Sequence, residues 1–148
     1  MRVVLDTNVL ISAVMSSGSP PGQIFDAIES GRLTLVTSAE QLAEFEAVID
    51  RPKLQRFFRN GRREAVLRLL AERTERVGDL PTVTLSRDPD DDLILATAVA
   101  GRVDALVTGD RRDLLALESV EGIPIVSPRR FLDLLDQFDP PGGSIGSR

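Results

Sequence analysis

The chain has 148 residues, 42% of them hydrophobic, with a formal net charge of −5 at pH 7 and neither cysteine nor histidine. This length and apolar content fit one globular domain with a single core. The absence of cysteine excludes disulfides, thiolate metal sites and a cysteine nucleophile, and the absence of histidine removes the usual general base near neutral pH. Catalysis would have to use carboxylates, hydroxyls, lysine or arginine, and carboxylate oxygens select magnesium, manganese or calcium over zinc or copper.

The hydropathy of the sequence gives no sign of a membrane-spanning segment. No apolar run approaches the roughly 18 residues that a membrane span needs, and the apolar start of the chain is interrupted by Asp6 and Asn8. We therefore expect no membrane association and no targeting segment. The lack of cysteine fits the reducing cytoplasm.

Basic residues concentrate in one segment of this acidic chain. Residues 51–76 contain nine basic and three acidic side chains, so this segment carries +6 and the remainder −11. Such a strip beside an acidic remainder is typical of a protein that binds a phosphate backbone near a metal–carboxylate centre. A solvated helix face would explain the same pattern. The residues expected to contact a nucleic-acid backbone are Arg51, Lys53, Arg56 and Arg59.

Apolar runs alternate with amphipathic stretches, which predicts strands and helices in turn. Gly31 follows one helix where a left-handed residue is favoured, Ser38 is the expected N-cap of the next, and Ser127 with Pro128 begins the last. Residues 123–126 should lie at a sheet edge because they include a proline. The predicted elements in chain order are strand 3–5, helix 22–30, strand 33–36, helix 39–50, helix 62–76, strand 83–85, helix 93–100, strand 105–108, strand 123–126 and helix 128–138.

This alternation predicts an α/β fold, a three-layer α/β/α sandwich around a parallel sheet, in one domain over residues 1–138. Residues 139–148 are rich in proline and glycine, and we expect them to be disordered. In such a fold, ligands bind outside the carboxyl ends of the strands. Asp6 and Asp110 each follow a strand-like run and should project there, while Glu44 would have to reach this edge from the side of a helix.

Several carboxylates at one edge would repel one another and raise each other's pKa unless a cation neutralised them. In two-metal hydrolysis the ions activate water and stabilise the leaving oxygen, so no histidine base is required. Each acid also has a simpler explanation. An aspartate after a strand often starts a loop, residues 88–92 could only cap a helix, and nothing intrinsic prefers Glu44 over Glu40 or Glu46.

The ordered set of acidic motifs carries more information than any single member. Across residues 2–136 the chain resembles the PIN-domain family, and more narrowly its bacterial and archaeal branch of toxins from toxin–antitoxin pairs. The motifs that carry this resemblance are Leu5-Asp6-Thr7-Asn8-Val9-Leu10, the helical glutamate in Ser38–Glu44, Asp88-Pro89-Asp90-Asp91-Asp92 and Val107-Thr108-Gly109-Asp110.

The resemblance implies a magnesium- or manganese-dependent endoribonuclease that is often dimeric and often inhibited by a co-expressed antitoxin. Residue by residue, Asp6, Glu44, Asp91 and Asp110 match the acidic quartet that binds the metal. Asn8 and Thr108 would orient carboxylates or water. Asp91 is chosen by its seven-residue offset to Ala98, and Asp92 and Asp88 stay as alternatives; many relatives have asparagine at the position of Asp92.

Three other functions compete with this interpretation. A non-catalytic domain could bind a protein or RNA partner with the same edge. A phosphatase using Asp6 as a nucleophile usually needs a second acid two residues on, where this chain has Asn8. A dinucleotide binder would need a glycine-rich turn after Leu5, which is absent. The RNA target, the antitoxin and the number of metal ions are left open.

Overall fold

The computed structural model describes residues 1–110 and 112–138. The predicted disordered tail, 139–148, lies outside the described residues. The elements are β1 (Arg2–Leu5), α1 (Thr7–Met15), α2 (Pro20–Glu29), β2 (Thr34–Ser38), α3 (Ala39–Ile49), the 3-10 helix η1 (Pro52–Phe57), α4 (Arg62–Arg73), β3 (Thr74–Val77), α5 (Pro89–Gly101), β4 (Ala105–Val107), α6 (Leu114–Leu117), β5 (Ser119–Val120), β6 (Ile123–Val126) and α7 (Pro128–Phe138). Among the described helices, none is long and apolar enough to cross a membrane.

The strands form one sheet in the order β3-β2-β1-β4-β6-β5. Every neighbouring pair is parallel except β5 and β6, which are antiparallel. The chain builds outward from β1 on one side through β2 and β3, and then crosses to place β4 on the other side of β1. The strand order therefore reverses between β1 and β4, which is where an open α/β sheet forms its binding crevice.

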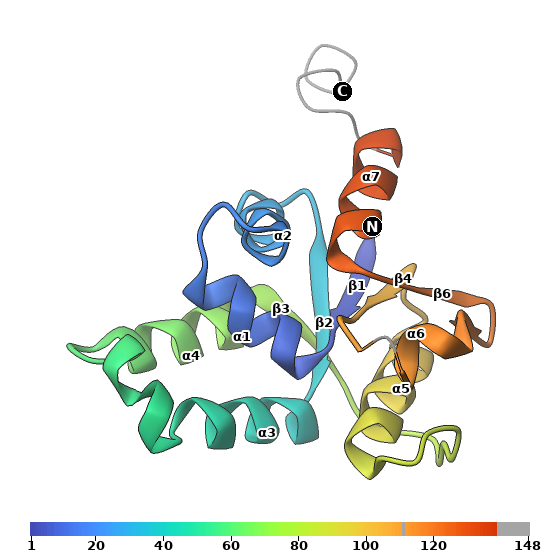
Figure 1. Cartoon of the computed structure of the whole chain (residues 1–148), viewed down its shortest axis with the longest axis horizontal. Coiled ribbons are helices and arrows are strands. Elements are labelled where there is room, and N and C mark those ends of the chain that lie inside the picture. Colours follow the sequence, from blue (N-terminus) through green and yellow to red (C-terminus); the bar gives the residue numbers. More distant parts are fainter. Residues whose placement is uncertain (111, 139–148) are drawn as a thin grey trace.

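Side chains of the central strands alternate between two cores, because successive residues of a strand point to opposite faces. Val3, Leu5 and Val107 pack against α1, α2, α3, α4 and α7, whereas Val4 and Leu106 pack against α5 and α6. Figure 1 shows the sheet between these two groups of helices, with α5 and α6 on one side. The predicted three-layer sandwich is confirmed, with one short antiparallel strand added to an otherwise parallel sheet.

Local end signals act where the sequence predicts them. The Ser38 hydroxyl accepts a hydrogen bond from the Gln41 backbone N–H at 3.2 Å and caps α3. Ser127 accepts a hydrogen bond from the Arg130 N–H at 3.2 Å at the start of α7. Gly31 has φ +83° after α2, a conformation that glycine adopts without strain.

Helix α1 was not predicted, because its sequence lacks an amphipathic stripe. Six of its nine residues are buried, among them Thr7 and the consecutive Val9, Leu10 and Ile11, so the apolar positions do not show helical spacing. The helix begins directly after β1, and the carboxylate of Asp6 caps it. The acid that follows the first strand is thus also the first residue of a strand-to-helix turn.

The predictions for 62–76 and 83–85 were wrong in a related way. Helix α4 ends at Arg73, and Thr74–Val77 form β3, which pairs in parallel with β2. The edge of the sheet beside β2 is therefore already occupied. Residues 83–85 form no strand, and the backbone N–H of Leu85 donates instead to the carboxylate of Asp92 at 3.0 Å.

The expectation of an edge position for 123–126 was also wrong. Strand β6 lies between β4 and the two-residue β5, which is the edge strand. Pro124 is opposite Ser119 in this antiparallel pair. The Ile125 N–H donates to the Glu118 carbonyl at 2.9 Å, so pairing on this side does not need a donor from the proline.

Candidate functional site

A cleft of about 300 Å³ opens at the carboxyl ends of β1 and β4, where the strand order reverses. All four acids of the predicted quartet line it, and so does Asn8. Among the described residues of this lining, Arg51 is the one basic side chain. The seven carboxylates in the lining are those of Asp6, Glu44, Asp88, Asp90, Asp91, Asp110 and Asp113.

Asp6 is held between the two halves of the sheet. Its N–H donates to the Val107 carbonyl at 2.9 Å, and its carboxylate accepts hydrogen bonds from the Thr108 hydroxyl at 2.8 Å and the Asn8 N–H at 3.3 Å. Burial raises the pKa of Asp6, and the Asp110 carboxylate adds to this rise, while the Thr108 hydrogen bond opposes it. Thr108 thus orients the carboxylate directly, whereas the contact from Asn8 uses the backbone and not the side-chain amide.

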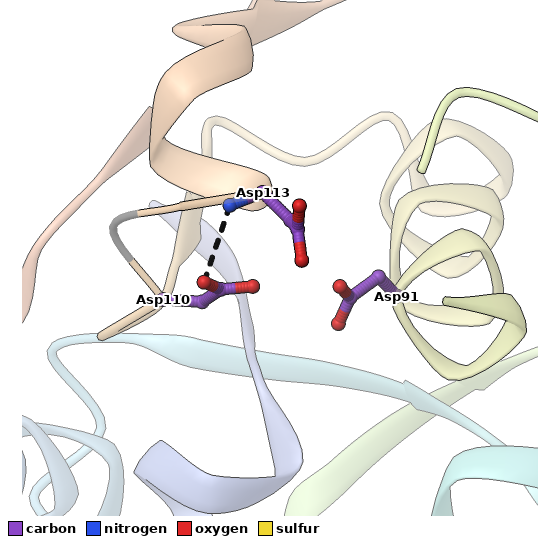
Figure 2. Close-up of side chains that lie close together, drawn as sticks. All are labelled: Asp91, Asp110 and Asp113. Carbon is purple, nitrogen blue, oxygen red and sulfur yellow. Dashed lines mark hydrogen bonds between the residues drawn. The ribbon is translucent and has the colours of Figure 1, made fainter. Parts of the chain in front are cut away.

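The acids at the start of α5 have different partners. Asp88 caps the helix by accepting a hydrogen bond from the backbone N–H two residues on, at 2.9 Å. Asp92 accepts the N–H groups of Ser86, at 2.8 Å, and of the residue before it, so its carboxylate anchors the preceding loop. Asp91 accepts the Ser86 hydroxyl at 3.2 Å and turns toward Asp110 (Figure 2). Of the three candidates, Asp91 alone joins the carboxylate cluster across the cleft.

A tight turn after β4 brings two further carboxylates to face α5. Asp110 accepts a hydrogen bond from the Asp113 N–H at 3.2 Å, and its own N–H donates to the Thr108 hydroxyl at 3.0 Å. Figure 2 shows Asp110 and Asp113 on one side and Asp91 on the other. One oxygen of each of these three side chains lies within 4.8 Å of the others. Asp113 therefore belongs to the site although the sequence did not single it out.

Glu44 reaches the cleft from α3, on a different wall. It accepts a hydrogen bond from the hydroxyl of Thr7, the buried first residue of α1. Burial raises the pKa of Glu44, the hydrogen bond from Thr7 opposes the rise, and the neighbouring carboxylates of Asp90 and Asp6 add to it. Glu44 thus lies near Asp90 and Asp6, and it is not part of the cluster formed by Asp91 with the two aspartates after β4.

A buried polar network fixes the position of α3 relative to β1. Gln41, one turn before Glu44, donates from its side-chain amide to the Leu5 carbonyl at 2.6 Å and accepts the Thr37 hydroxyl at 3.0 Å. Gln41 is 1% exposed, so these contacts satisfy groups that water cannot reach. This network sets where the wall that carries Glu44 meets the strand that ends at Asp6.

The donor set of the cleft fits a hard divalent cation. Its carboxylates offer only oxygen ligands, and they crowd together without a matching positive charge. Burial raises the pKa of Asp91 from 3.8 to about 6, and the carboxylates of Asp88, Asp110 and Asp6 add to the rise. Such mutual repulsion is what a bound cation would relieve.

Only part of the predicted basic strip remains available to a ligand. Arg63 forms ion pairs with Asp50 and Glu46 at 2.6 and 2.7 Å, and the Arg62 guanidinium donates to the carbonyl of Val14. These contacts join α4 to α3 and α1. Of the residues expected to contact RNA, Arg51 lines the cleft. Lys53 and Arg56 are exposed on η1, and Arg59 is exposed in the loop after it.

Comparison with protein families identifies the family of this chain. A family model described as the PIN domain matches residues 2–112, which include all four acids of the predicted quartet. The chain belongs to the PIN-domain family. PIN domains are generally nucleases.

Individual relatives align with most of the length of this PIN domain. The uncharacterized protein MJ1680 of Methanocaldococcus jannaschii is 26% identical over 147 residues, covering 93% of this chain and 94% of that protein. A chain in the structure of VapBC2 from Rickettsia felis, bound to a DNA fragment from their promoter, has a TM-score of 0.58 at 16% identity, covering 86% and 98% of the two chains. PAE2754 from Pyrobaculum aerophilum has a TM-score of 0.54 at 17% identity, covering 93% and 90%.

Three side chains of the candidate site were not predicted because their positions depend on tertiary contacts. Asp113 enters the cleft through a turn, Thr7 reaches Glu44 from a helix that was not predicted, and Gln41 meets β1 only after α3 has docked. One signal was present in the sequence, since Asp113 follows Asp110 at the three-residue spacing of a single turn.

Proposed function

We propose that this PIN domain is a magnesium- or manganese-dependent endoribonuclease and the toxin of a toxin–antitoxin pair. The observation that carries the proposal is the convergence of Asp6, Glu44, Asp91 and Asp110 on one cleft, where Asp91 and Asp110 are close enough to share a cation. When bound, the cation would supply a water molecule of lowered pKa and neutralise negative charge on the phosphate oxygens.

Each side chain of the cleft has a role in this proposal. Asp91 and Asp110, joined by Asp113, would hold the cation. Asp6, whose carboxylate is fixed by Thr108 at the end of β1, would be a further ligand. Glu44, on the opposite wall, supports the same ion or a second one. Asn8 lines the cleft, where its side-chain amide would orient a carboxylate or a water molecule.

The RNA follows the basic side of the molecule into the cleft. Arg51 lies in the lining, and we propose that Lys53 and Arg56 on η1 and Arg59 just after it extend a positive track from it. RNA is the proposed substrate because the chain resembles ribonuclease toxins, and an exposed track of this kind binds a backbone without reading its sequence. A co-expressed antitoxin, a homodimeric assembly and a cytoplasmic location complete the proposal; they rest on the same resemblance.

The test is cleavage of a mixed single-stranded RNA pool by the purified protein with magnesium or manganese, beside an EDTA control. Asp91→Asn removes one expected ligand, and Asp133→Asn changes an exposed aspartate of α7 as the matched control. We expect cleavage that needs the cation, is lost in Asp91→Asn and is retained in Asp133→Asn. Circular dichroism of both variants would establish that they are folded.

Other outcomes separate the alternatives. A wild-type protein that binds neither magnesium nor manganese would contradict the proposal and favour a non-catalytic interaction domain. Binding of the cation without cleavage of the pool would restrict the activity to a structured or rare RNA. Cleavage by Asp91→Asn at the wild-type rate would remove this residue from the metal centre.

A further inference from the structure

Arg87 lies at the rim of the cleft, where it contacts one of the lining carboxylates. Its guanidinium forms an ion pair with Asp113 at 3.0 Å, while 84% of the Arg87 side chain is exposed. Asp113 in turn belongs to the carboxylate cluster with Asp91 and Asp110. Arg87 is thus paired with a carboxylate that would also be a ligand of the proposed cation.

The backbone around Arg87 is fixed, although its side chain is not buried. The Ser86 N–H donates to Asp92 at 2.8 Å, and the Asp88 N–H donates to the Ser86 hydroxyl at 3.2 Å. These bonds tie the residues on both sides of Arg87 to the start of α5. An exposed ion pair is worth little free energy, so the guanidinium can leave Asp113 without disturbing this anchor.

The negative charge of the cleft suggests a role for the Arg87 guanidinium in binding phosphate. Seven carboxylates and, among the described residues, one basic side chain line the cleft, so an approaching phosphate meets strong repulsion on the walls away from Arg51. Arg51 lies just beyond α3, whereas Arg87 is held at the wall formed by the segment after β4. A guanidinium offers a planar fork of N–H donors that matches the oxygens of a phosphate.

We propose that Arg87 is a positioning residue for the RNA and that it changes partner when the cation binds. Without the cation it neutralises Asp113; once the cation takes the carboxylates, Arg87 turns to a backbone phosphate next to the one that is cleaved. This inference rests on the proposed function. It assigns Arg87 a contact on the side of the cleft opposite the basic track of Arg51.

This exchange predicts effects of opposite sign in one variant. Arg87→Gln removes a competitor for Asp113, so magnesium affinity should rise by up to about fivefold, the equivalent of an exposed ion pair. The same variant loses a phosphate contact, so RNA affinity should fall by about tenfold and the salt slope of binding by about 0.7. Arg87→Lys keeps the charge without the fork and should fall between Arg87→Gln and the wild type.

The experiment uses the full chain and two binding readouts. Magnesium affinity is measured from the rise in Tm with concentration, and RNA affinity from the fluorescence anisotropy of a labelled 2′-O-methyl oligonucleotide pool in magnesium, at several salt concentrations. Arg102→Gln is the matched control, because Arg102 is exposed just after the far end of α5. It should leave both affinities at wild-type values.

The outcomes distinguish this inference from the proposed function. Stronger magnesium binding together with weaker RNA binding in Arg87→Gln supports the exchange. Parallel losses in both affinities would mean that Arg87 only stabilises the fold, and values equal to those of Arg102→Gln would mean that it has no role; either result overturns the inference while leaving the nuclease proposal intact. A wild-type protein that binds neither magnesium nor the oligonucleotide would overturn both.

Discussion

Replacing Asp91 by asparagine should stabilise the metal-free protein while it disables the metal centre. The pKa of Asp91 is raised from 3.8 to about 6, chiefly by burial and then by neighbouring carboxylates. Each step of one in pKa corresponds to about 1.4 kcal/mol, which sets an upper limit of about 3 kcal/mol for the destabilisation by the charged form. Partial exposure and screening reduce this to about 1–1.5 kcal/mol, or about 3 °C in Tm for a chain of this size.

The pH dependence gives the sign of this effect. Above the raised pKa of about 6, Asp91 is charged in the folded and unfolded states, so the folded state carries the full penalty that Asp91→Asn removes. As pH falls from 6 toward 3.8, the folded state takes up its proton first and the penalty shrinks; below 3.8 both states are protonated and no gain remains. Asparagine can still accept the hydrogen bond that Ser86 donates to this side chain.

The assay is urea unfolding in EDTA at pH 8 and at pH 4, with Asp133→Asn as the control. Asp91→Asn should be more stable than the wild type at pH 8, and only about 0.3 kcal/mol more stable at pH 4, where little of the penalty remains. Magnesium at a hundred times its Kd should then reverse the order at pH 8, since it stabilises the wild type by about 2.7 kcal/mol and the variant far less. An Asp91→Asn variant that is less stable than the wild type at pH 8 in EDTA would refute the reasoning.

Further predictions follow from the same cleft. Thr108→Val should lower the free energy of unfolding by about 1–3 kcal/mol in urea titrations. The loss should be larger at pH 8 than at pH 5, because the hydrogen bond from Thr108 favours the charged form of Asp6. Thr108→Ser keeps the hydroxyl and should retain most of the stability. Magnesium should raise Tm more at pH 8 than at pH 5, because protons compete for carboxylates of raised pKa, and equal rises would exclude them as ligands. Gln41→Leu should destabilise the fold by about 2–3 kcal/mol, because it leaves the Leu5 carbonyl without its 2.6 Å donor, and wild-type stability would show the network to be dispensable.

The fold class could be predicted because the central strands are short apolar runs with strong end signals. Strand β1 ends at an aspartate, α3 begins at a capping serine, and Gly31 closes α2, so each boundary is encoded within a few residues. What failed were elements that depend on the partner beside them. The stretch at 74–77 becomes a strand because β2 offers an open edge, and 83–85 does not because Asp92 takes up its backbone donor.

The candidate site also contains residues that the sequence could place and residues that only tertiary contacts could distinguish. Asp6 and Asp110 could be placed from sequence, because the carboxyl ends of parallel strands meet at one edge of the sheet. Asp91 could not be separated from Asp92 by sequence alone, since both stand in the first turn of α5. Their hydrogen bonds separate them, because Asp92 anchors a loop while Asp91 crosses toward Asp110.

The hydrogen bond between Thr108 and Asp6 links residues that are 102 positions apart in the sequence, so it can form only late in synthesis of the chain. Strand β1 leaves the ribosome early and pairs with β2, but its other neighbour, β4, is made much later. A nascent chain that stops before Thr108 lacks Asp110 and Asp113, and its Asp6 has no hydroxyl partner. The cleft is therefore completed only after β4 and the residues up to Asp113 have been translated, so shorter translation products lack part of the proposed metal site.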